Sequence, residues 1–372
     1  MVLEQAERLE ETGAGIQLSP NATQILIALG VGERLRPHAV MPQALRVLRA
    51  RGGREIVRMP LGEAATQRYG APYWSIHRGD LQAALAAAVG AELDISLRLG
   101  IRVEDFAVHG NGVIVSARGR SGVWHERGDV LLAADGLWSA VRARIGFREP
   151  PRFAGRAAWR ALVPAAEAAP EFREPLVHLW LGRKAHIVHY PVKAGAAINI
   201  VVIANDTWRT PERWSEPATR DDLLPRLSGE QLAPQLLGLI GQPDAWLKWA
   251  LFDRAPLAAW SQGPIALLGD AAHPMLPYLA QGAAMGIEDA AVAAQCLARM
   301  PDDAAAALRA YCAVRRARTA KVQRLAARNG GRYHRGIIGA ALRDAAMRTM
   351  GGARLLHHYD WLYDWRPPTP IT

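Results

Sequence analysis

Gly269-Asp270-Ala271-Ala272-His273-Pro274 lies between a predicted strand and a predicted helix, and this placement decides the expected fold. The apolar run from Ile265 to Leu268 just before it is typical of a buried strand, and the segment from Gly282 to Met300 after it is compatible with a helix. A strand that ends in Gly-Asp and continues through a loop into a helix places one carboxylate at the carboxyl edge of a sheet. Because ligands bind at that edge in open α/β folds, the segment predicts an α/β fold with a ligand site beside Asp270.

A second apolar run, Val130 to Ala134, also ends in an acidic turn, Asp135-Gly136, and continues to Ser139 and Arg142. An Asp-Gly pair at the end of a strand can contact a cofactor in a nucleotide cleft, and Ser139 can cap the helix that follows. The alternative is an ordinary turn followed by a capped helix. Two strands that end in this way favour a shared cofactor site.

These segments resemble motifs of the FAD-dependent aromatic hydroxylases, the single-component flavoprotein monooxygenases that include salicylate and 3-hydroxybenzoate hydroxylases. The stretch from Gly269 to Asp289 is similar to their flavin-binding motif, and Asp135 to Arg142 is similar to their Asp-Gly-x-x-Ser-x-x-Arg fingerprint. The resemblance covers nearly the whole chain. It implies an FAD-binding Rossmann-like domain, an inserted antiparallel-sheet substrate domain and C-terminal helices.

The resemblance also implies a reaction, the hydroxylation of a phenolic or aromatic-acid substrate. NADH or NADPH binds transiently and reduces the bound FAD, dioxygen adds to the reduced flavin, and the resulting C4a-hydroperoxide delivers an electrophilic oxygen to the ring. Water must be excluded, since otherwise the hydroperoxide decays to hydrogen peroxide. The expected enzyme is therefore an FAD- and NAD(P)H-dependent monooxygenase, and its expected partners are a small aromatic substrate and O2.

Several contacts with the flavin follow from the resemblance. Asp270 binds the ribitol hydroxyls, with a cap on the turn as its alternative role, and Pro274 lies against the flavin edge. The helix that begins at Gln281-Gly282 directs its partially positive N-terminus at the flavin N1–C2=O locus, which is anionic in reduced flavin. Gly269 belongs to the same motif. Glu288 and Asp289 lie further along that helix. For them a structural role, as a helix cap and in the helix dipole, is expected at least as much as a contact with the flavin.

Three more contacts with FAD are implied outside these two motifs. Arg78, just before an alanine-rich helix, resembles the arginine that contacts the flavin side of the cofactor, with a surface salt bridge as the alternative. Gly15, in Gly13-Ala14-Gly15, has no side chain and permits close approach to the isoalloxazine ring, although the loop is also a plausible helix entry. Glu4 resembles the acidic residue that binds the adenosine ribose.

The substrate side is predicted from Ala185-His186-Ile187-Val188-His189-Tyr190-Pro191. Side chains alternate along a strand, so His186 and Tyr190 share one face and His189 lies on the other. A histidine and a tyrosine on one face can bind a phenolate and remove its proton, and His-x-x-x-Tyr-Pro has that role in 3-hydroxybenzoate-type hydroxylases. His186 is therefore the expected base and Tyr190 its partner, while the alternative places both as ordinary core residues. No metal site is expected, because no histidines, His357-His358 included, have metal-ligand spacing.

The start of the chain departs from the family pattern. The family opens with a strand, a G-x-G-x-x-G turn and a helix, and the amides of that turn hold the FAD pyrophosphate. This chain begins at Met1-Val2-Leu3-Glu4, which resembles the end of the family's second strand, and no G-x-G-x-x-G occurs in its first hundred residues. The sequence therefore predicts that the first βα unit is missing, through a misplaced start, which we favour, or a real deletion. Its loss is expected to weaken FAD binding and to expose apolar side chains worth roughly 10 kcal/mol.

The middle of the chain has a different character from its two ends. From about Arg152 to Arg254 strands alternate and Trp and Pro become frequent, which is typical of an antiparallel sheet that covers a ligand. Arg51-Gly52-Gly53-Arg54 predicts a hairpin that joins this sheet. The predicted domains are an FAD-binding domain, residues 1–40, 76–151 and 256–372, and a substrate-binding domain, residues 41–75 and 152–255.

The chain is strongly basic, with 45 Lys and Arg against 35 Asp and Glu and a formal net charge of +10. Almost all of this charge comes from scattered arginines, so nucleic-acid binding is not expected. Arg315-Arg316-Ala317-Arg318 is a cluster, and a solvated helix face is its expected setting. Cys296 and Cys312 fall in helical stretches, and no signal peptide or spanning segment is found, which indicates a cytoplasmic protein. A monomer or homodimer is expected, although the sequence does not determine the oligomeric state.

Three alternatives to a phenol hydroxylase stay open from the sequence. The first is an epoxidase or another flavin monooxygenase that acts on a non-phenolic substrate, in which His186 has little importance. The second is a non-catalytic remnant that cannot hold FAD, which cofactor retention would distinguish. The third, nucleic-acid binding, requires an affinity that depends strongly on salt.

Overall fold

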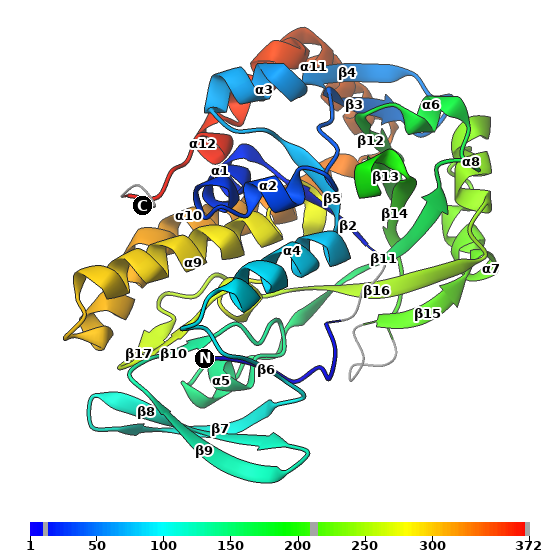
Figure 1. Cartoon of the computed structure of the whole chain (residues 1–372). Coiled ribbons are helices and arrows are strands. Elements are labelled where there is room, and N and C mark those ends of the chain that lie inside the picture. The colour runs from blue at the N-terminus through cyan, green and yellow to red at the C-terminus, as the bar shows by residue number, and fades with distance from the viewer. Residues whose placement is uncertain (10–13, 209–214, 369–372) are drawn as a thin grey trace.

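The computed structural model describes residues 1–9, 14–208 and 215–368, so Gly13 of the predicted flavin loop lies outside the described residues. A large twisted sheet occupies one side of the molecule and a helix-rich part occupies the other (Figure 1). The eight strands of the sheet come from two separate stretches of the chain. In spatial order they are β15 (Ser215–Thr219), β16 (Ala245–Asp253), β11 (Arg152–Pro164), β14 (Ala197–Asn205), β13 (Ala185–Val192), β12 (Leu176–Leu181), β3 (Ala44–Arg49) and β4 (Glu55–Pro60).

The predicted hairpin joins the large sheet as expected, but it does so through a parallel pair. β3 and β4 are antiparallel, whereas β3 runs parallel to β12, with Leu176 aligned to Ala44 and Leu181 to Arg49. The expectation of a purely antiparallel sheet is therefore wrong at this one pair. β3 is not connected to β12 by a short turn, because more than a hundred residues separate them in the chain, so their relative direction is not forced to alternate.

The helix-rich part contains short parallel strand pairs. β10 (Leu131–Ala133) pairs with β18 (Ile265–Leu267), which also pairs with β17 (Ser261–Gln262). Because Ala133 is aligned with Leu267, the turns that follow these strands, at Asp135 and Gly269, leave the same edge. The remaining small sheets are β1 (Val2–Glu4) with β6 (Leu97–Leu99), β2 (Gly15–Leu18) with β5 (Trp74–His77), and the meander β7 (Arg102–His109), β8 (Gly112–Gly119) and β9 (Gly122–Gly128).

Long helices surround these strands. α9 (Gly282–Arg299) packs on α1 (Pro20–Ala28) and α10 (Ala304–Tyr333), and α11 (Ile337–His358) lies across β4. The helix predicted from Gly282 to Met300 is confirmed to within one residue. None of the described helices is long and apolar enough to cross a membrane. The others are α2 (Gly32–Leu35), α3 (Gly62–Tyr69), α4 (Arg78–Ala91), α5 (Ala140–Arg144), α6 (Pro170–Arg173), α7 (Arg220–Leu223), α8 (Pro234–Gly241) and α12 (Asp360–Tyr363).

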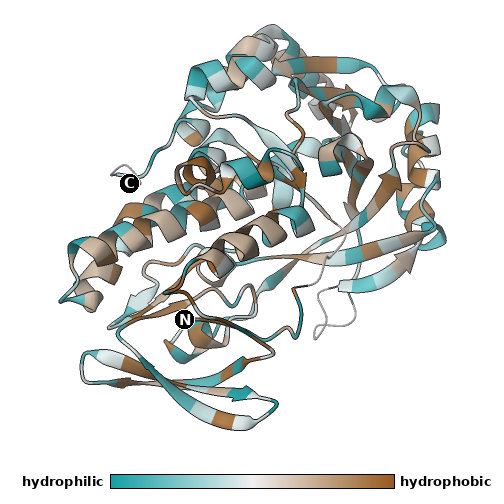
Figure 2. Ribbon diagram, viewed as in Figure 1, coloured by the Kyte–Doolittle hydropathy of each residue, from teal (hydrophilic) through white to brown (hydrophobic). Residues whose placement is uncertain are grey.

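The two faces of the large sheet have different neighbours, and this difference positions the site. Trp159 and neighbouring apolar residues of one face pack with α8, and the strands at this part of the sheet are mostly apolar (Figure 2). The opposite face carries Ala158 and Tyr190 and packs toward Tyr278, which precedes α9. The predicted fold class, an α/β fold with a covering sheet and C-terminal helices, is confirmed. The domain boundaries stay a prediction, although all eight strands of the large sheet fall within residues 41–75 and 152–255.

Candidate active site

Gly269 and Asp270 form the turn after β18. Gly269 has a φ of +59°, a left-handed conformation that residues with a side chain rarely adopt. Its backbone also lies close to that of Gly286 on α9. Asp270 is exposed to solvent and has no hydrogen-bond partner among the described residues. Desolvation by the surrounding protein raises the pKa of its carboxyl, while His273 and Arg78 oppose this rise. The turn therefore presents a free carboxyl at the edge of the strands, where a ligand hydroxyl can reach it.

The Asp135 turn is tied to the Gly269 turn by one buried arginine. Arg142 donates from Nη1 to the carbonyl oxygens of Ala271 and Ala272, at 3.0 and 3.1 Å. Ser139 caps α5 by accepting from the Arg142 amide at 2.9 Å, as predicted. Asp135 accepts from the amide of Val141 at 3.2 Å, which is a turn-capping contact, and Gly136 has a φ of +76°.

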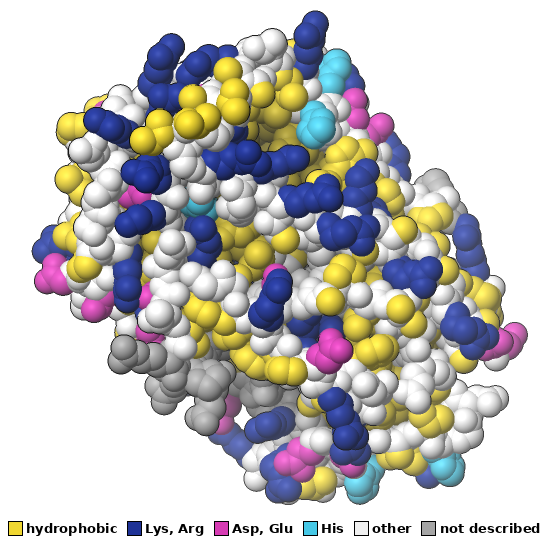
Figure 3. All heavy atoms as spheres, turned by 180° about the vertical axis from the view of Figure 1, so that it is seen from behind, with side chains coloured by type: hydrophobic (Ala, Val, Ile, Leu, Met, Phe, Trp, Pro, Cys, Tyr) yellow, Lys and Arg dark blue, Asp and Glu magenta, His cyan; other side chains and the backbone are white. Residues whose placement is uncertain are grey.

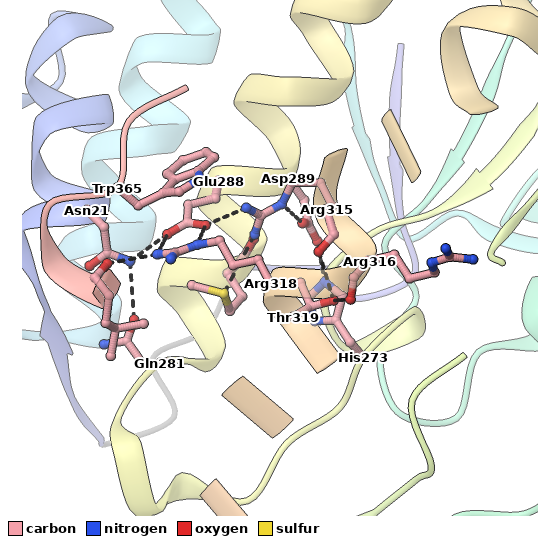
Figure 4. Close-up of polar contacts among 12 residues, drawn as sticks. Asn21, His273, Gln281, Glu288, Asp289, Arg315, Arg316, Arg318, Thr319 and Trp365 are labelled. Atoms are coloured by element: carbon pink, nitrogen blue, oxygen red, sulfur yellow. Dashed lines mark hydrogen bonds and ion pairs between the residues drawn. The ribbon is translucent and has the colours of Figure 1, made fainter. Parts of the chain in front are cut away.

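A buried ion-pair network holds α9 against the Gly269 turn and α10 (Figure 4). Arg315 is 0% exposed and pairs with Glu288 and with Asp289, where its Nε donates to Oδ1 at 2.7 Å. Asp289 also accepts from the Gly269 amide at 3.0 Å and contacts His273. Burial opposes ionisation of Asp289, but His273 and Arg315 outweigh it and hold its pKa below the usual value.

This network corrects two expectations. Arg315-Arg316-Ala317-Arg318 is not a solvated helix face, because Arg315 is buried and Arg318 pairs with Glu288, and Arg316 is the one exposed arginine of the three. Glu288 and Asp289 have a structural role, which was one of the two roles expected for them. They act through ion pairs with α10, however, and not as a helix cap, since both lie in the second turn of α9. The residues next to Arg315 in the sequence give no sign of its partners, because Glu288 and Asp289 lie on another helix.

Gln281 and Pro274 are buried beside this network. Gln281 is the residue before α9, and its amide donates from Nε2 to Ser19 Oγ at 2.8 Å while its Oε1 accepts from Asn21 at 3.2 Å. These bonds fix the first residue of α9, Gly282, relative to α1. The carbonyl of Pro274 accepts from Gln323 Nε2 at 3.0 Å. The N-terminus of α9 is thereby held at the edge that carries Asp270.

Gly15 lies against the large sheet, at the place where the sheet face carries Tyr190. Its amide donates to Asn199 Oδ1 at 2.7 Å, and a Cβ on Gly15 would lie only 2.7 Å from Asn199 Cγ and 2.8 Å from Tyr190 Cε2. A side chain here would therefore displace both neighbours. This approach brings the predicted flavin loop and the predicted substrate strand into contact.

Arg160 adds a cation to the same face, and sequence reasoning missed it. On β11 it alternates with the buried Trp159 and lies on the face of Tyr190, stacked on the ring of Trp249 at 4.3 Å. No described carboxylate pairs with it, and its Nε is buried without a hydrogen-bond partner. Desolvation lowers the pKa of Arg160, and the positive charge of Arg78 lowers it further. The signal that could have revealed it is an arginine between the buried Trp159 and Ala161, in the apolar second half of the strand.

His186 lies on the same face, further along β13. It is 2% exposed, and its ring contacts those of Tyr278 and Tyr333. Its Nδ1 lies 3.0 Å from Nε2 of His334, a residue that sequence reasoning also missed. Burial, with His334 and Arg156 adding to it, lowers the pKa of His186 well below the usual value, so the ring is neutral at neutral pH. Neutral imidazole is the form that accepts a proton.

His189 lies on the opposite face of β13, as the alternation predicts, in a separate group of rings. It stacks on His178 of β12 with 4.4 Å between ring centroids and accepts from Trp180 Nε1 at 2.9 Å. Burial lowers the pKa of both histidines, to about 4 for His178, where Arg46 adds to the effect. These two rings have no contact with the site face and serve the packing of the sheet.

The depressed pKa of His178 predicts a loss of stability in acid. As the pH falls below about 6.5, His178 takes up a proton in the unfolded state, whereas in the folded state it does so only near pH 4. Its contribution to the free energy of unfolding is therefore complete above about pH 6.5 and is lost as the pH falls toward about 4. We expect His178 alone to contribute about 2 kcal/mol to the loss between pH 7 and pH 5. Urea unfolding at both pH values measures it. Between pH 7 and pH 5 the free energy of unfolding of His178→Gln should fall by about 2 kcal/mol less than that of the parent protein. An equal fall in the two proteins would contradict the assignment of this loss to His178.

Glu4 is the predicted site residue that the structure leaves apart from the rest. It ends β1, and its Oε1 accepts from the amide of Ala6 at 2.8 Å, a local bond. β1 belongs to a different sheet from β10 and β18, which carry the Asp135 and Gly269 turns. Arg78 is the first residue of α4, and its amide donates to the carbonyl oxygen of Ala14 at 2.8 Å. The remaining predicted residues fall into two groups. The turns after β10 and β18 with the start of α9 form one, and Gly15, Tyr190 and His186 lie along the sheet face.

The residues of these groups fit the flavin and ribitol portion of FAD. A carboxyl without a hydrogen-bond partner, Asp270, suits ribitol hydroxyls, and the amides at the start of α9 suit an electron-rich locus. Gly15 brings its backbone against Tyr190 of the sheet, so a ring held at this loop would lie next to the predicted substrate strand. Strand-end turns at one edge with a covering sheet opposite them are the arrangement expected of a dinucleotide-binding site in an α/β protein.

Comparison with known proteins identifies the family. Residues 1–326 match the family described as the FAD binding domain. A 3-hydroxybenzoate 6-hydroxylase of Aquipseudomonas alcaligenes is 36% identical over 364 residues, which cover 98% of this chain and 91% of that protein. A 3-amino-4-hydroxybenzoate 2-monooxygenase of Streptomyces platensis is also 36% identical, over 97% of this chain and 89% of its own. A salicylate hydroxylase in a substrate complex is 27% identical, with a TM-score of 0.79, over 95% of this chain and 88% of its own. The chain belongs to the FAD-dependent aromatic hydroxylases.

Proposed function

We propose that this protein is an FAD- and NAD(P)H-dependent monooxygenase that hydroxylates an aromatic ring bearing a phenolic hydroxyl and a carboxylate. One observation carries the proposal: a neutral histidine, His186, and an unpaired guanidinium, Arg160, share one face of the sheet. The histidine suits a phenolic hydroxyl, and the guanidinium suits a carboxylate. Two relatives are named for hydroxybenzoate substrates, which carry both groups.

FAD is the cofactor, and we assign its contacts to the residues at the strand edge. Asp270 would hold the ribitol hydroxyls, the amides at Gln281-Gly282 would stabilise the N1–C2=O locus, and the loop at Gly15 would lie beside the ring. Bound FAD, once reduced by NADH or NADPH, supplies the activation of dioxygen. The large sheet excludes water from the reacting atoms. We assign the remaining contacts to Glu4, Arg78, Asp135, Gly136, Gly269 and Pro274.

His186 and Tyr190 act on the substrate hydroxyl in this proposal. Neutral His186 takes the hydroxyl proton, and the electron pair that stays on the oxygen raises the electron density of the ring. Burial raises the pKa of Tyr190 to about 12, so its hydroxyl stays protonated and can donate to the phenolate. The two side chains thereby have different roles, one as base and one as hydrogen-bond donor.

Arg160 holds the substrate carboxylate. Replacing it by the neutral Arg160→Gln is expected to raise KM for 3-hydroxybenzoate about 10- to 100-fold with a smaller effect on kcat, because a hydrogen-bonded charge pair is worth roughly 1.5–3 kcal/mol. The measurement is steady-state NADH oxidation with the substrate varied.

Two controls isolate the charge at Arg160. Arg152→Gln makes the same change on the same strand at an exposed arginine that pairs with Asp253, and it should leave KM unchanged. 3-Hydroxybenzamide lacks the carboxylate, so its KM should be similar in the parent protein and in Arg160→Gln. An equal rise for both compounds would show that the residue supports the fold of the strand and does not bind the anion.

The function is tested by comparing substrates with and without the phenolic hydroxyl. With FAD in excess, we expect 3-hydroxybenzoate to stimulate NADH or NADPH oxidation and to give a dihydroxybenzoate, and we expect benzoate to give no hydroxylated product. A non-phenolic alkene that is converted to its epoxide, with 3-hydroxybenzoate inert, would replace the proposal by the epoxidase alternative.

The charge distribution on the back of the molecule does not favour nucleic-acid binding (Figure 3). Figure 3 shows Lys and Arg side chains scattered over the back of the molecule, with acidic and apolar side chains between them. Cys296 and Cys312 are free and buried, as is usual in a reducing compartment, and we propose a cytoplasmic monomer or homodimer.

A further inference from the structure

A chain of hydrogen bonds runs from His186 to the end of α10. His334 directly follows α10, its Nε2 lies 3.0 Å from Nδ1 of His186, and its Nδ1 lies 2.9 Å from the carbonyl oxygen of Gly330, four residues earlier. His334 is half-buried, whereas His186 is buried. The chain thus links the proposed base to a backbone group whose hydrogen-bonding role is fixed.

The carbonyl sets the direction of every bond in this chain. A carbonyl oxygen only accepts, so His334 Nδ1 carries the proton that is donated to Gly330. In a neutral ring the other nitrogen then has a lone pair, and His334 Nε2 accepts from Nδ1–H of His186. His186 therefore has its own lone pair on Nε2, the nitrogen that has no hydrogen-bond partner among the described residues.

Arg156 determines that His334 stays neutral. Its Nη1 lies close to both ring nitrogens of His334 and 3.0 Å from Nε2, so its positive charge opposes protonation of the ring. Burial and the charge of Arg156 lower the pKa of His334 to about 4, and Arg343 acts in the same direction. Of the other groups around the pair, Tyr278 and Tyr333 are neutral phenols, since burial raises their pKa.

We propose that His334 is a positioning residue that holds His186 in the Nδ1–H tautomer and so keeps the Nε2 lone pair free for the substrate proton. The inference rests on the proposed role of His186 as base. When the substrate hydroxyl gives its proton to His186 Nε2, the electron pair stays on the phenolate oxygen. His334 keeps its single proton, because Arg156 opposes a second one.

The tautomer is measured directly, without turnover. In protein labelled with ¹⁵N-histidine, ¹H–¹⁵N correlation spectra across the ring distinguish Nδ1–H from Nε2–H, and His186→Phe assigns the signal. We expect Nδ1–H for His186 in the parent protein and in His334→Gln, whose amide oxygen can accept the same bond. In His334→Phe we expect the Nε2–H form to appear. Finding Nε2–H in the parent protein, or no change in His334→Phe, would overturn the proposal.

Activity gives a second readout. His334→Phe is expected to lower kcat for 3-hydroxybenzoate roughly ten- to hundredfold with KM little changed, as for other residues that orient a reacting side chain. His334→Gln should restore most of the rate, and His38→Phe, at an exposed histidine, should match the parent protein. If His186→Phe retains full activity, the proposed base is wrong, whereas the tautomer spectra still decide whether His334 orients His186.

Discussion

Replacing Arg315 by Met is expected to destabilise the protein by about 3–5 kcal/mol, the largest loss of stability that we predict for a single substitution. The variant Arg315→Met keeps much of the side-chain volume but removes the buried guanidinium, so that, among the described ion-pairing side chains, Glu288 keeps only Arg318 and Asp289 only His273. Both carboxylates are 0% exposed, so water cannot replace the guanidinium without opening the helices. Urea unfolding followed by circular dichroism measures the change.

Arg316→Met is the matched control. It changes the adjacent residue in the same way, but Arg316 is exposed and its described bond is to the carbonyl of Ala258 at 2.7 Å, so we expect a loss below about 1 kcal/mol. Asp289 also holds the Gly269 amide, so Arg315→Met should weaken FAD binding as well. Equal midpoints for the two variants would contradict the account of the network.

Replacing His186 by Phe is expected to have the largest effect on activity, a loss of about 10²- to 10⁴-fold in hydroxylated product per second. The phenylalanine ring can occupy the same space between Tyr278 and Tyr333, so the fold should persist. The substrate then keeps its phenolic proton and its ring is a poorer nucleophile. We expect NADH oxidation to continue with hydrogen peroxide as the product, and an assay of both products separates the two outcomes.

The pH dependence of His186→Phe distinguishes a lost base from a damaged site. Hydroxide can remove the proton of the phenol, whose pKa is near 10, so the rate of the variant should rise about tenfold per pH unit between pH 7 and pH 9. The parent protein should show a flatter profile in that range, because the low pKa of His186 keeps it neutral throughout. A variant with a flat, uniformly low profile would argue against a role in proton transfer.

Local patterns in the sequence predict much of this molecule. The strand, turn and helix around Gly269 lie where the apolar run and the Gly-Asp pair indicate. The alternation along β13 places His186 and His189 on opposite faces, as expected. These features depend on a few consecutive residues, and the periodicity of a strand or helix is enough to predict them.

The residues that sequence reasoning missed are defined by partners far away in the chain. Arg315 is buried because Glu288 and Asp289 reach it from another helix. His334 matters because the end of α10 meets β13, a contact between residues 148 positions apart. Arg160 differs, since it is notable for having no described carboxylate nearby, and only the arrangement of all strands around it reveals that.

The most direct test of the proposed function is the amount of hydroxylated product formed per NADH or NADPH consumed. The protein is incubated with excess FAD, air, the reductant and 3-hydroxybenzoate, and dihydroxybenzoate and hydrogen peroxide are both measured. We expect substrate to stimulate oxidation of the reductant and most of the consumed reductant to appear as dihydroxybenzoate. Hydrogen peroxide alone, at a rate that does not depend on 3-hydroxybenzoate, would contradict the account of a phenolic acid held by His186 and Arg160.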